Sequence, residues 1–115
     1  MEIILKNISW SFTFGNLTHS EFNKEVRNFE NDNWQPDEVV INAPQIIIIY
    51  GCWPIGDKET TITSDNNQCF TACELLFKIH HAISKDLEYA DHHWFEGLEL
   101  LSPGEIPRYR LHLGS

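Results

Sequence analysis

The chain has little of what membrane, secreted or nucleic-acid-binding proteins require. Its longest apolar stretch, residues 46–50, is far shorter than the roughly 18 residues of a membrane span. Its three cysteines, Cys52, Cys69 and Cys73, are an odd number, and no basic region followed by an apolar one marks an export signal. We therefore expect reduced thiols and a cytoplasmic protein. Only 8 Lys and Arg stand against 17 Asp and Glu, and a net charge of −9 disfavours direct binding to nucleic acid.

The usual catalytic signatures are missing as well. With 6 glycines, the chain has no Gly-rich phosphate loop, no Gly-x-Ser-x-Gly turn and no dinucleotide fingerprint. Acidic side chains are abundant, but no pattern singles out a pair for acid–base catalysis. The sequence therefore predicts a protein that is not an enzyme and that needs no cofactor.

What is present is enough apolar material for one core. Of the 115 residues, 42% are hydrophobic and 12% are aromatic, and no repeat or linker divides the chain. We expect a single domain over residues 1–115.

The first half of the chain predicts a strand, a helix and three more strands. Apolar and polar residues alternate over residues 8–14, which is typical of a strand with one buried face. Thr18 and Glu21 have the spacing of a capping box, so a helix should begin there and end near Asn31. Further strands are expected at residues 39–41, 46–50 and 59–63. Four consecutive isoleucines in the second of these predict a central strand covered on both faces.

The second half repeats this pattern. Thr71 and Glu74 form another capping box, and a helical stripe of apolar residues follows. The stripe comprises Leu75, Leu76, Ile79, Ala82, Ile83 and Leu87. Strands are expected at residues 92–101 and 108–113, joined around Pro103. The order of elements favours an α+β fold with two helices packed on a largely antiparallel sheet of about five to six strands.

The acids are unevenly distributed. The stretch between Lys85 and Arg108 contains six acids and no base. Such a field attracts a basic protein and accelerates the encounter, although many acidic proteins use their charge only for solubility. Trp94 lies in the same stretch and adds an aromatic anchor to the negative rim. We therefore take as candidate partner-binding residues Asp86, Glu88, Asp91, Trp94, Glu96 and Glu99.

Two other tryptophans, Trp34 and Trp53, are expected in loops. Each could anchor an interface or fold back as a lid over a small core.

The histidines suggest an alternative, a metal site. His80 and His81 lie in the second predicted helix, and His92 and His93 open the next strand after Asp91. Because neighbouring side chains point in different directions, one of His80 or His81 could join Asp91 and His93 around a divalent metal such as zinc. No standard ligand spacing supports this, and solvated or core-edge histidines explain the same residues.

A reactive cysteine is a further alternative. Cys73 is expected in the first turn of the second helix, where the helix dipole lowers the pKa of a thiol. His80, about two turns further on, is too far away to act as its base. A buried, unreactive thiol is the more frequent outcome.

In size, acidity and lack of catalytic motifs the chain resembles the small immunity proteins of bacterial contact-dependent and polymorphic toxin systems. The segments that carry the likeness are residues 70–76, 91–100 and 109–115. These proteins share no single fold, so no residue role is transferred from them. The resemblance implies a cytoplasmic inhibitor that binds a basic toxin domain, often a nuclease, and blocks its active site. The alternatives are a metal-dependent protein that uses the histidines and a structural subunit that forms a homo-oligomer.

Overall fold

The computed structural model describes residues 3–28, 34–52, 56–87 and 92–114. Within these ranges the chain forms an α+β fold, as expected, with two helices, a six-stranded sheet and a two-stranded sheet. The strands are β1 (Ile3–Ile4), β2 (Trp10–Ser11), β3 (Val39–Ile41), β4 (Gln45–Cys52), β5 (Gly56–Thr63), β6 (Phe70–Thr71), β7 (Trp94–Ser102) and β8 (Arg108–Gly114). The helices are α1 (His19–Asn28) and α2 (Ala72–Leu87).

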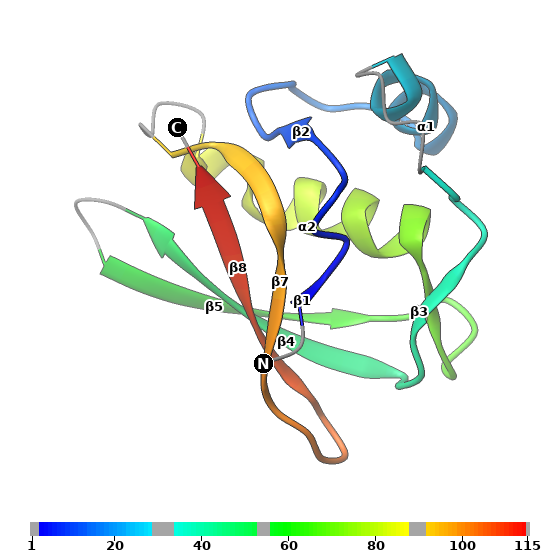
Figure 1. Cartoon of the computed structure of the whole chain (residues 1–115), viewed down its shortest axis with the longest axis vertical. Helices are drawn as coiled ribbons and strands as arrows, with labels where there is room; N and C mark the ends of the chain where they lie inside the picture. The colour runs from blue at the N-terminus through cyan, green and yellow to red at the C-terminus, as the bar shows by residue number, and fades with distance from the viewer. Residues whose placement is uncertain (1–2, 29–33, 53–55, 88–91, 115) are drawn as a thin grey trace.

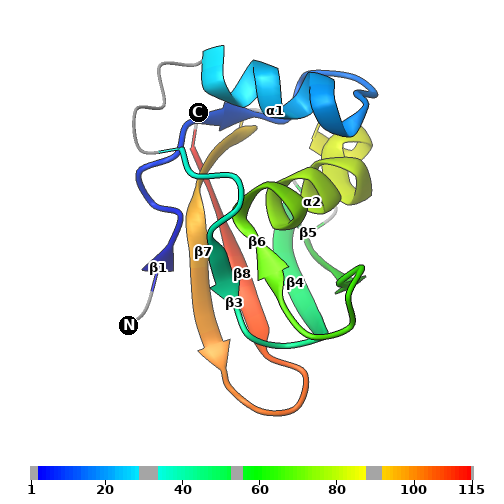
Figure 2. The same cartoon turned by 90° about the vertical axis from the view of Figure 1, so that its right-hand side faces the viewer.

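The large sheet is mixed. Its order is β1-β7-β8-β4-β5, and β2 also pairs with β7. Among the strand pairs of the described residues, β4–β8 is parallel and the others are antiparallel, including the β3–β6 pair of the small sheet. Helix α2 lies against one face of the large sheet, and α1 lies beside α2 at the end of the molecule where β2 is found (Figures 1 and 2). In the described part of the chain, no helix is long and apolar enough to cross a membrane.

Helix α2 supplies the centre of the core. All predicted members of its apolar stripe are fully buried except Ala82, which is exposed. The buried face also includes Cys73 and His80, so it is rotated away from Ala82. The expectation for Ala82 was wrong because alanine, which is small and favours helices, is also common at exposed helix positions.

Both helix starts follow the predicted caps, with one difference. At α1 the Glu21 N–H donates to Thr18 Oγ1 (3.2 Å) and the Thr18 N–H donates to Glu21 Oε1 (2.9 Å). At α2 the Glu74 N–H donates to Thr71 Oγ1 (3.2 Å), but the Glu74 carboxylate accepts from the Asp65 N–H (2.6 Å). The second cap therefore ties the loop before β6 to the helix.

Strand β4 is covered differently on its two faces. Ile46 and Ile48 are fully buried on the helix side, as expected. Ile49 lies on the other face beside Arg110 of β8 and is still only 8% exposed. No helix in the described ranges lies on that face (Figures 1 and 2), so the expectation of a strand covered by a layer on both faces was wrong.

The N-terminal strand is shorter than its alternation predicts. Only Trp10 and Ser11 pair with β7, although Ile8 and Phe12 are buried as expected. Ser11 is buried too, against the alternation, because its hydroxyl lies 2.7 Å from Thr13 Oγ1 and forms a hydrogen bond.

Trp34 folds back as a lid. It is 6% exposed, and its Nε1–H donates to Asn23 Oδ1 at 2.7 Å. This resolves the choice left open for Trp34, while Trp53 lies outside the described residues.

The N-terminal segment runs along the edge of β7 and approaches it closely at Gly97. This glycine has a φ of +113°, and a Cβ built on it would lie 2.8 Å from Ile3 Cγ2 and 3.2 Å from the Ile4 carbonyl oxygen. The close approach therefore requires a residue without a side chain. Leu5 next to it also has a positive φ, of 57°.

We expect the substitution Gly97→Ala to lower the free energy of unfolding by about 2–4 kcal/mol, because backbone strain and a steric clash add up. The matched control is Gly104→Ala. Gly104 has a φ of +144° but no atom within 4 Å of its built Cβ, so it carries the strain alone. Urea unfolding of both variants measures the difference. Equal losses at the two positions would show that Ile3 and Ile4 move aside for a Cβ at Gly97, so that the clash adds nothing to the backbone strain.

Candidate partner-binding site

Asp86, one of the predicted contacts, is used inside the protein. The Tyr50 hydroxyl donates to Asp86 Oδ2 at 2.6 Å, and Lys58 Nζ donates to Asp86 Oδ1 at 3.3 Å. The Tyr50 hydrogen bond, helped by Lys58, lowers the pKa of the Asp86 carboxyl. Asp86 therefore connects the end of α2 to β4 and β5.

Glu99 is also paired, on the other side of the sheet. Its Oε1 lies 2.8 Å from His112 Nε2, and it stands opposite Arg110 in the β7–β8 ladder. Glu99 lies on the same face of the sheet as Arg110 and as Ile49, which is next to Arg110 on β4. Tyr50, the residue after Ile49, points to the opposite face and there contacts Asp86. Glu99 and Asp86 therefore lie on opposite faces of the sheet. The predicted set is therefore not one continuous surface. Glu88 and Asp91 lie outside the described residues.

Trp94 and Glu96, in contrast, meet in one hollow. They lie two residues apart on β7 and therefore on the same side of the strand. The hollow has a volume of about 430 Å³. We call it the Trp94 hollow; its lining consists of Lys6, Ile8, Ser9, Trp94, Phe95 and Glu96. The Glu96 side chain is exposed and has no ion pair within 4 Å among the residues that the structure describes.

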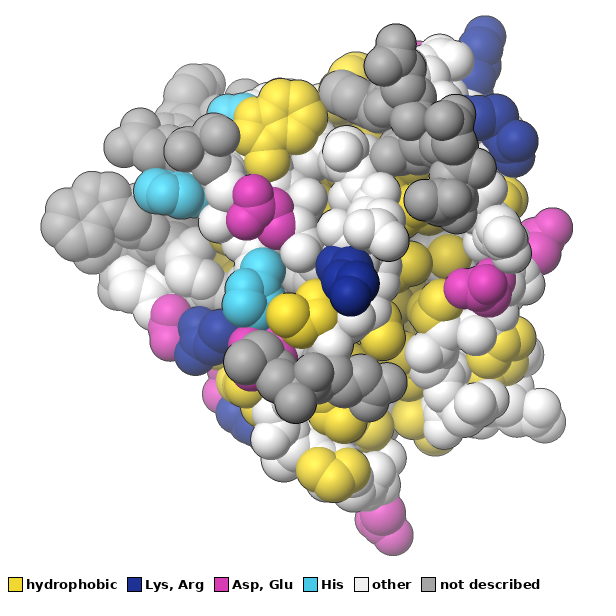
Figure 3. All heavy atoms as spheres, viewed as in Figure 1, with side chains coloured by type: hydrophobic (Ala, Val, Ile, Leu, Met, Phe, Trp, Pro, Cys, Tyr) yellow, Lys and Arg dark blue, Asp and Glu magenta, His cyan; other side chains and the backbone are white. Residues whose placement is uncertain are grey.

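A second hollow lies on the other side of the N-terminal segment. This N-terminal groove has a volume of about 410 Å³ and shares Lys6 and Ile8 with the Trp94 hollow. Its lining consists of Ile3, Ile4, Leu5, Lys6, Asn7, Ile8, Glu38, Val39 and Val40. In the space-filling view, hydrophobic side chains are visible in the hollowed area between β1 and β3 (Figure 3). Sequence reasoning missed this groove, and its only signal was the apolar run at residues 3–5, which had been given no element.

The open face of the sheet has balanced charges. Arg108 Nη2 lies 3.3 Å from Glu59 Oε2, and Arg110 Nη2 lies 3.2 Å from Asp57 Oδ2. These are exposed pairs of small stability value, but they neutralise the local field. The acids without such a partner in the described ranges include Glu96 and Glu38, which line the two adjoining hollows.

His80 is a core residue, and both nitrogens of its ring have hydrogen-bond partners. The Trp10 Nε1–H donates to His80 Nδ1 at 3.2 Å, and His80 Nε2 lies 2.9 Å from the Gly15 carbonyl oxygen. Since an indole only donates and a carbonyl only accepts, the ring is neutral with its proton on Nε2. Burial lowers the pKa of His80, and the Gly15 hydrogen bond opposes this only in part.

His81 and His93 also have polar partners. His81 Nε2 lies 2.9 Å from the Leu17 carbonyl oxygen, and His93 Nδ1 lies 3.2 Å from Ser11 Oγ. Across the described ranges, no three His, Cys, Asp or Glu side chains are grouped so that they could hold a metal ion. Asp91, the third member of the ligand set considered from the sequence, lies outside those ranges.

Cys73 has a histidine beside it that the sequence did not reveal. His19 of α1 places Nε2 at 3.4 Å from Cys73 Sγ. Burial, together with the nearby charge of Asp37, raises the pKa of the Cys73 thiol to about 11. Cys73 is also only 3% exposed. The pair therefore consists of the two residues of a catalytic Cys–His dyad, but it lacks both the lowered thiol pKa and the access to solvent that such a dyad requires.

Comparison with protein-family models, with curated proteins and with solved structures finds no match for this chain.

We expect the stability of the protein to fall as the pH drops below about 6.5, the ordinary pKa of histidine. The folded-state pKa of His80 is lowered, so the unfolded state takes up the proton first. The contribution of His80 is therefore complete above that pH and is lost as the pH falls through the folded-state pKa. Urea unfolding between pH 7.5 and 5 measures the slope.

The control for this experiment is His80→Leu. It should be less stable by about 2 kcal/mol at pH 7.5, because Trp10 Nε1 and the Gly15 carbonyl lose their buried partner. Its stability should change less with pH over the same interval. An equal slope in both proteins would assign the acid sensitivity to another group.

We expect Cys73 to react with iodoacetamide at pH 8 at least tenfold more slowly than Cys69, which is only partly buried. Peptide mass spectrometry after timed labelling of a Cys52→Ser variant measures both rates in one sample. Faster labelling of Cys73, abolished by His19→Ala, would contradict the inert assignment and indicate an activated thiol.

Proposed function

We propose that the protein is a stoichiometric binding protein for a basic protein partner, an immunity-type inhibitor that covers the active site of a toxin domain. The toxin class rests on the resemblance in size and acidity noted above, and the basic partner rests on charge. The mechanism is steric and electrostatic occlusion, and no chemical step by this chain is involved.

The observation that carries the proposal is the Trp94 hollow. Glu96, which has no ion pair in the described ranges and whose carboxylate lies against Gly114, lines the same hollow as Trp94, which is only partly buried. Aromatic side chains in hollows are typical interface anchors, and a charge at the rim governs the encounter rate more than the affinity. A basic side chain that enters beside Trp94 would meet both groups.

The ion pairs of the structure leave the acids of the two hollows unpaired. Asp57 and Glu59 of β5 are paired with arginines on the open sheet face, whereas Glu96 and Glu38, each lining one of the hollows, have no ion pair in the described ranges. With a net charge of −9, the protein attracts a basic partner from a distance, and the unpaired acids favour contact at the hollows.

The area available is sufficient. A stable interface buries about 800 Å² per partner. That is roughly an eighth of the accessible surface of this chain, 6616 Å². The two adjoining hollows and the N-terminal segment between them can form the centre of such a patch.

The first test is affinity capture of the tagged protein from its native cells at low and at moderate salt, read by mass spectrometry. A basic partner at about one equivalent, retained at low salt and weakened by more, is the expected result. Recovery of the protein alone under both conditions, in cells shown to express their toxin proteins, would overturn the proposal.

The residue-level prediction uses the captured partner. We expect Glu96→Lys to slow association at low salt by about tenfold and to weaken the salt dependence of the rate. Stopped-flow or surface plasmon resonance measures both quantities.

The matched control is Glu105→Lys, which makes the same charge change at an exposed residue between β7 and β8. Glu105 lies beyond the opposite end of β7 from Trp94, about 30 Å away along an extended chain. It should slow association much less. Equal effects of the two variants would show that net charge, and not the Trp94 hollow, determines the encounter.

A further inference from the structure

We infer that the N-terminal groove binds an extended segment of the partner, one that carries apolar side chains and a basic residue placed opposite Glu38. The inference deepens the proposed function and rests on it for the source of the segment. The groove itself is an observation independent of the Trp94 hollow.

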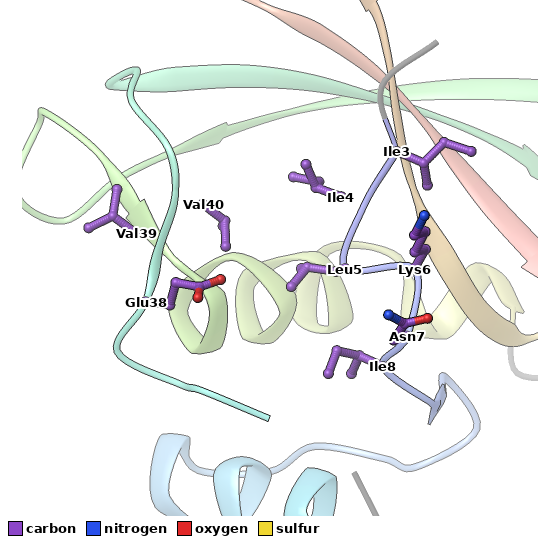
Figure 4. Close-up of a pocket in the computed structure, with 9 residues that line it drawn as sticks. All are labelled: Ile3, Ile4, Leu5, Lys6, Asn7, Ile8, Glu38, Val39 and Val40. Atoms are coloured by element: carbon purple, nitrogen blue, oxygen red, sulfur yellow. The ribbon is translucent and has the colours of Figure 1, made fainter. Parts of the chain in front are cut away.

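The walls of the groove are apolar and face each other. Ile4, Leu5 and Ile8 point from the N-terminal segment towards Val40 on β3, while Ile3 and Val39 point away from the gap (Figure 4). Both walls are short stretches of chain, residues 3–8 and 38–40, and α2 passes behind the gap in the same view. Apolar side chains that enter between them are removed from water on both sides.

The groove is large enough for the side chains of an extended chain but too small to enclose a turn of helix. One helical turn is about 10–12 Å across and 5.4 Å long, so it would need all of the groove's 410 Å³ or more. An extended segment presents successive side chains in opposite directions, one into the groove and the next towards solvent.

The groove is lined by one acid and one base, Glu38 and Lys6, and the acid faces the gap (Figure 4). The Glu38 carboxylate points into the gap, whereas Lys6 rises from the far side of the N-terminal segment (Figure 4). Glu38 is exposed and has no ion pair within 4 Å in the described ranges. A Lys or Arg of the segment can lay its aliphatic stem along the apolar wall and bring its charge to Glu38.

The same charge argues against a second copy of this chain as the occupant. Two copies would each bring a net charge of −9 to the contact, and their repulsion opposes association at ordinary salt. The negative field of the protein attracts a basic partner, whereas it repels a second copy of the chain.

The test uses a phage-displayed library of random dodecapeptides, selected on the immobilised protein. We expect enriched peptides with alternating apolar residues and at least one Lys or Arg. A synthetic peptide of the consensus sequence is then titrated into isotope-labelled protein, where the amide shifts should concentrate at residues 3–8 and 38–41.

Three variants locate the site. Val40→Asp should weaken binding of that peptide at least tenfold by placing a charge on the apolar wall. Glu38→Lys, at an exposed position that leaves the fold intact, should also weaken it at least tenfold. Val39→Asp makes the same change one residue away, at a side chain that is 48% exposed and points out of the groove, and it should leave the affinity unchanged.

Several results would overturn the inference. They are the absence of any peptide that distinguishes the wild-type protein from Val40→Asp, enrichment of acidic peptides, equal effects of Val39→Asp and Val40→Asp, and self-association of the protein that Val40→Asp abolishes. A native partner captured equally by wild-type protein and by Val40→Asp would leave the proposed function standing without the groove. Specific binding of basic peptides without any captured partner would leave the groove as a peptide site and remove the proposed function.

Discussion

The fold depends on one buried polar side chain, the imidazole of His80. A buried ring with two nitrogens is tolerated only if both find partners, and here the partners come from Trp10 and Gly15, about 70 residues away in the chain. Trp10, Phe12 and Phe22 surround the ring with centroids at 5.5–6.1 Å. The hydrogen bonds therefore fix the N-terminal segment against α2, while the aromatic contacts bring α1 to the same point.

The two surface hollows follow from this anchoring. The N-terminal segment is held at β2, where Trp10 meets His80, and at β1, which pairs with β7. Between the two points residues 5–9 are not paired with β7, and the segment passes close to Gly97 at Ile3, Ile4 and Lys6. The Trp94 hollow and the N-terminal groove both lie along this unpaired stretch, and Lys6 and Ile8 line both of them. The proposed binding surface is thus a consequence of the core.

Several acids outside the two hollows are paired with basic side chains of the protein itself. The basic side chains near the open sheet face, Arg108 and Arg110, are used by acids of β5. Asp86 and Glu99, which looked like partner contacts from the sequence, are also bound within the protein. Glu96 and Glu38, which line the hollows, have no ion pair within the described ranges. The net negative charge of an acidic protein can attract a basic partner from any direction, while its unpaired acids define where the partner docks.

Short-range order was predictable from the sequence because its causes lie within a few residues of each other. The cap of α1, the stripe of α2 and the β-branched strands β4 and β5 follow from spacing alone. The parallel β4–β8 contact, the pairing of Glu99 with His112, and the groove between residues 3–8 and 38–40 join parts of the chain that are distant in sequence. No local pattern encodes which acid meets which base across a sheet, since that depends on register and face. Only the tertiary structure therefore decided which acids stay available to a partner.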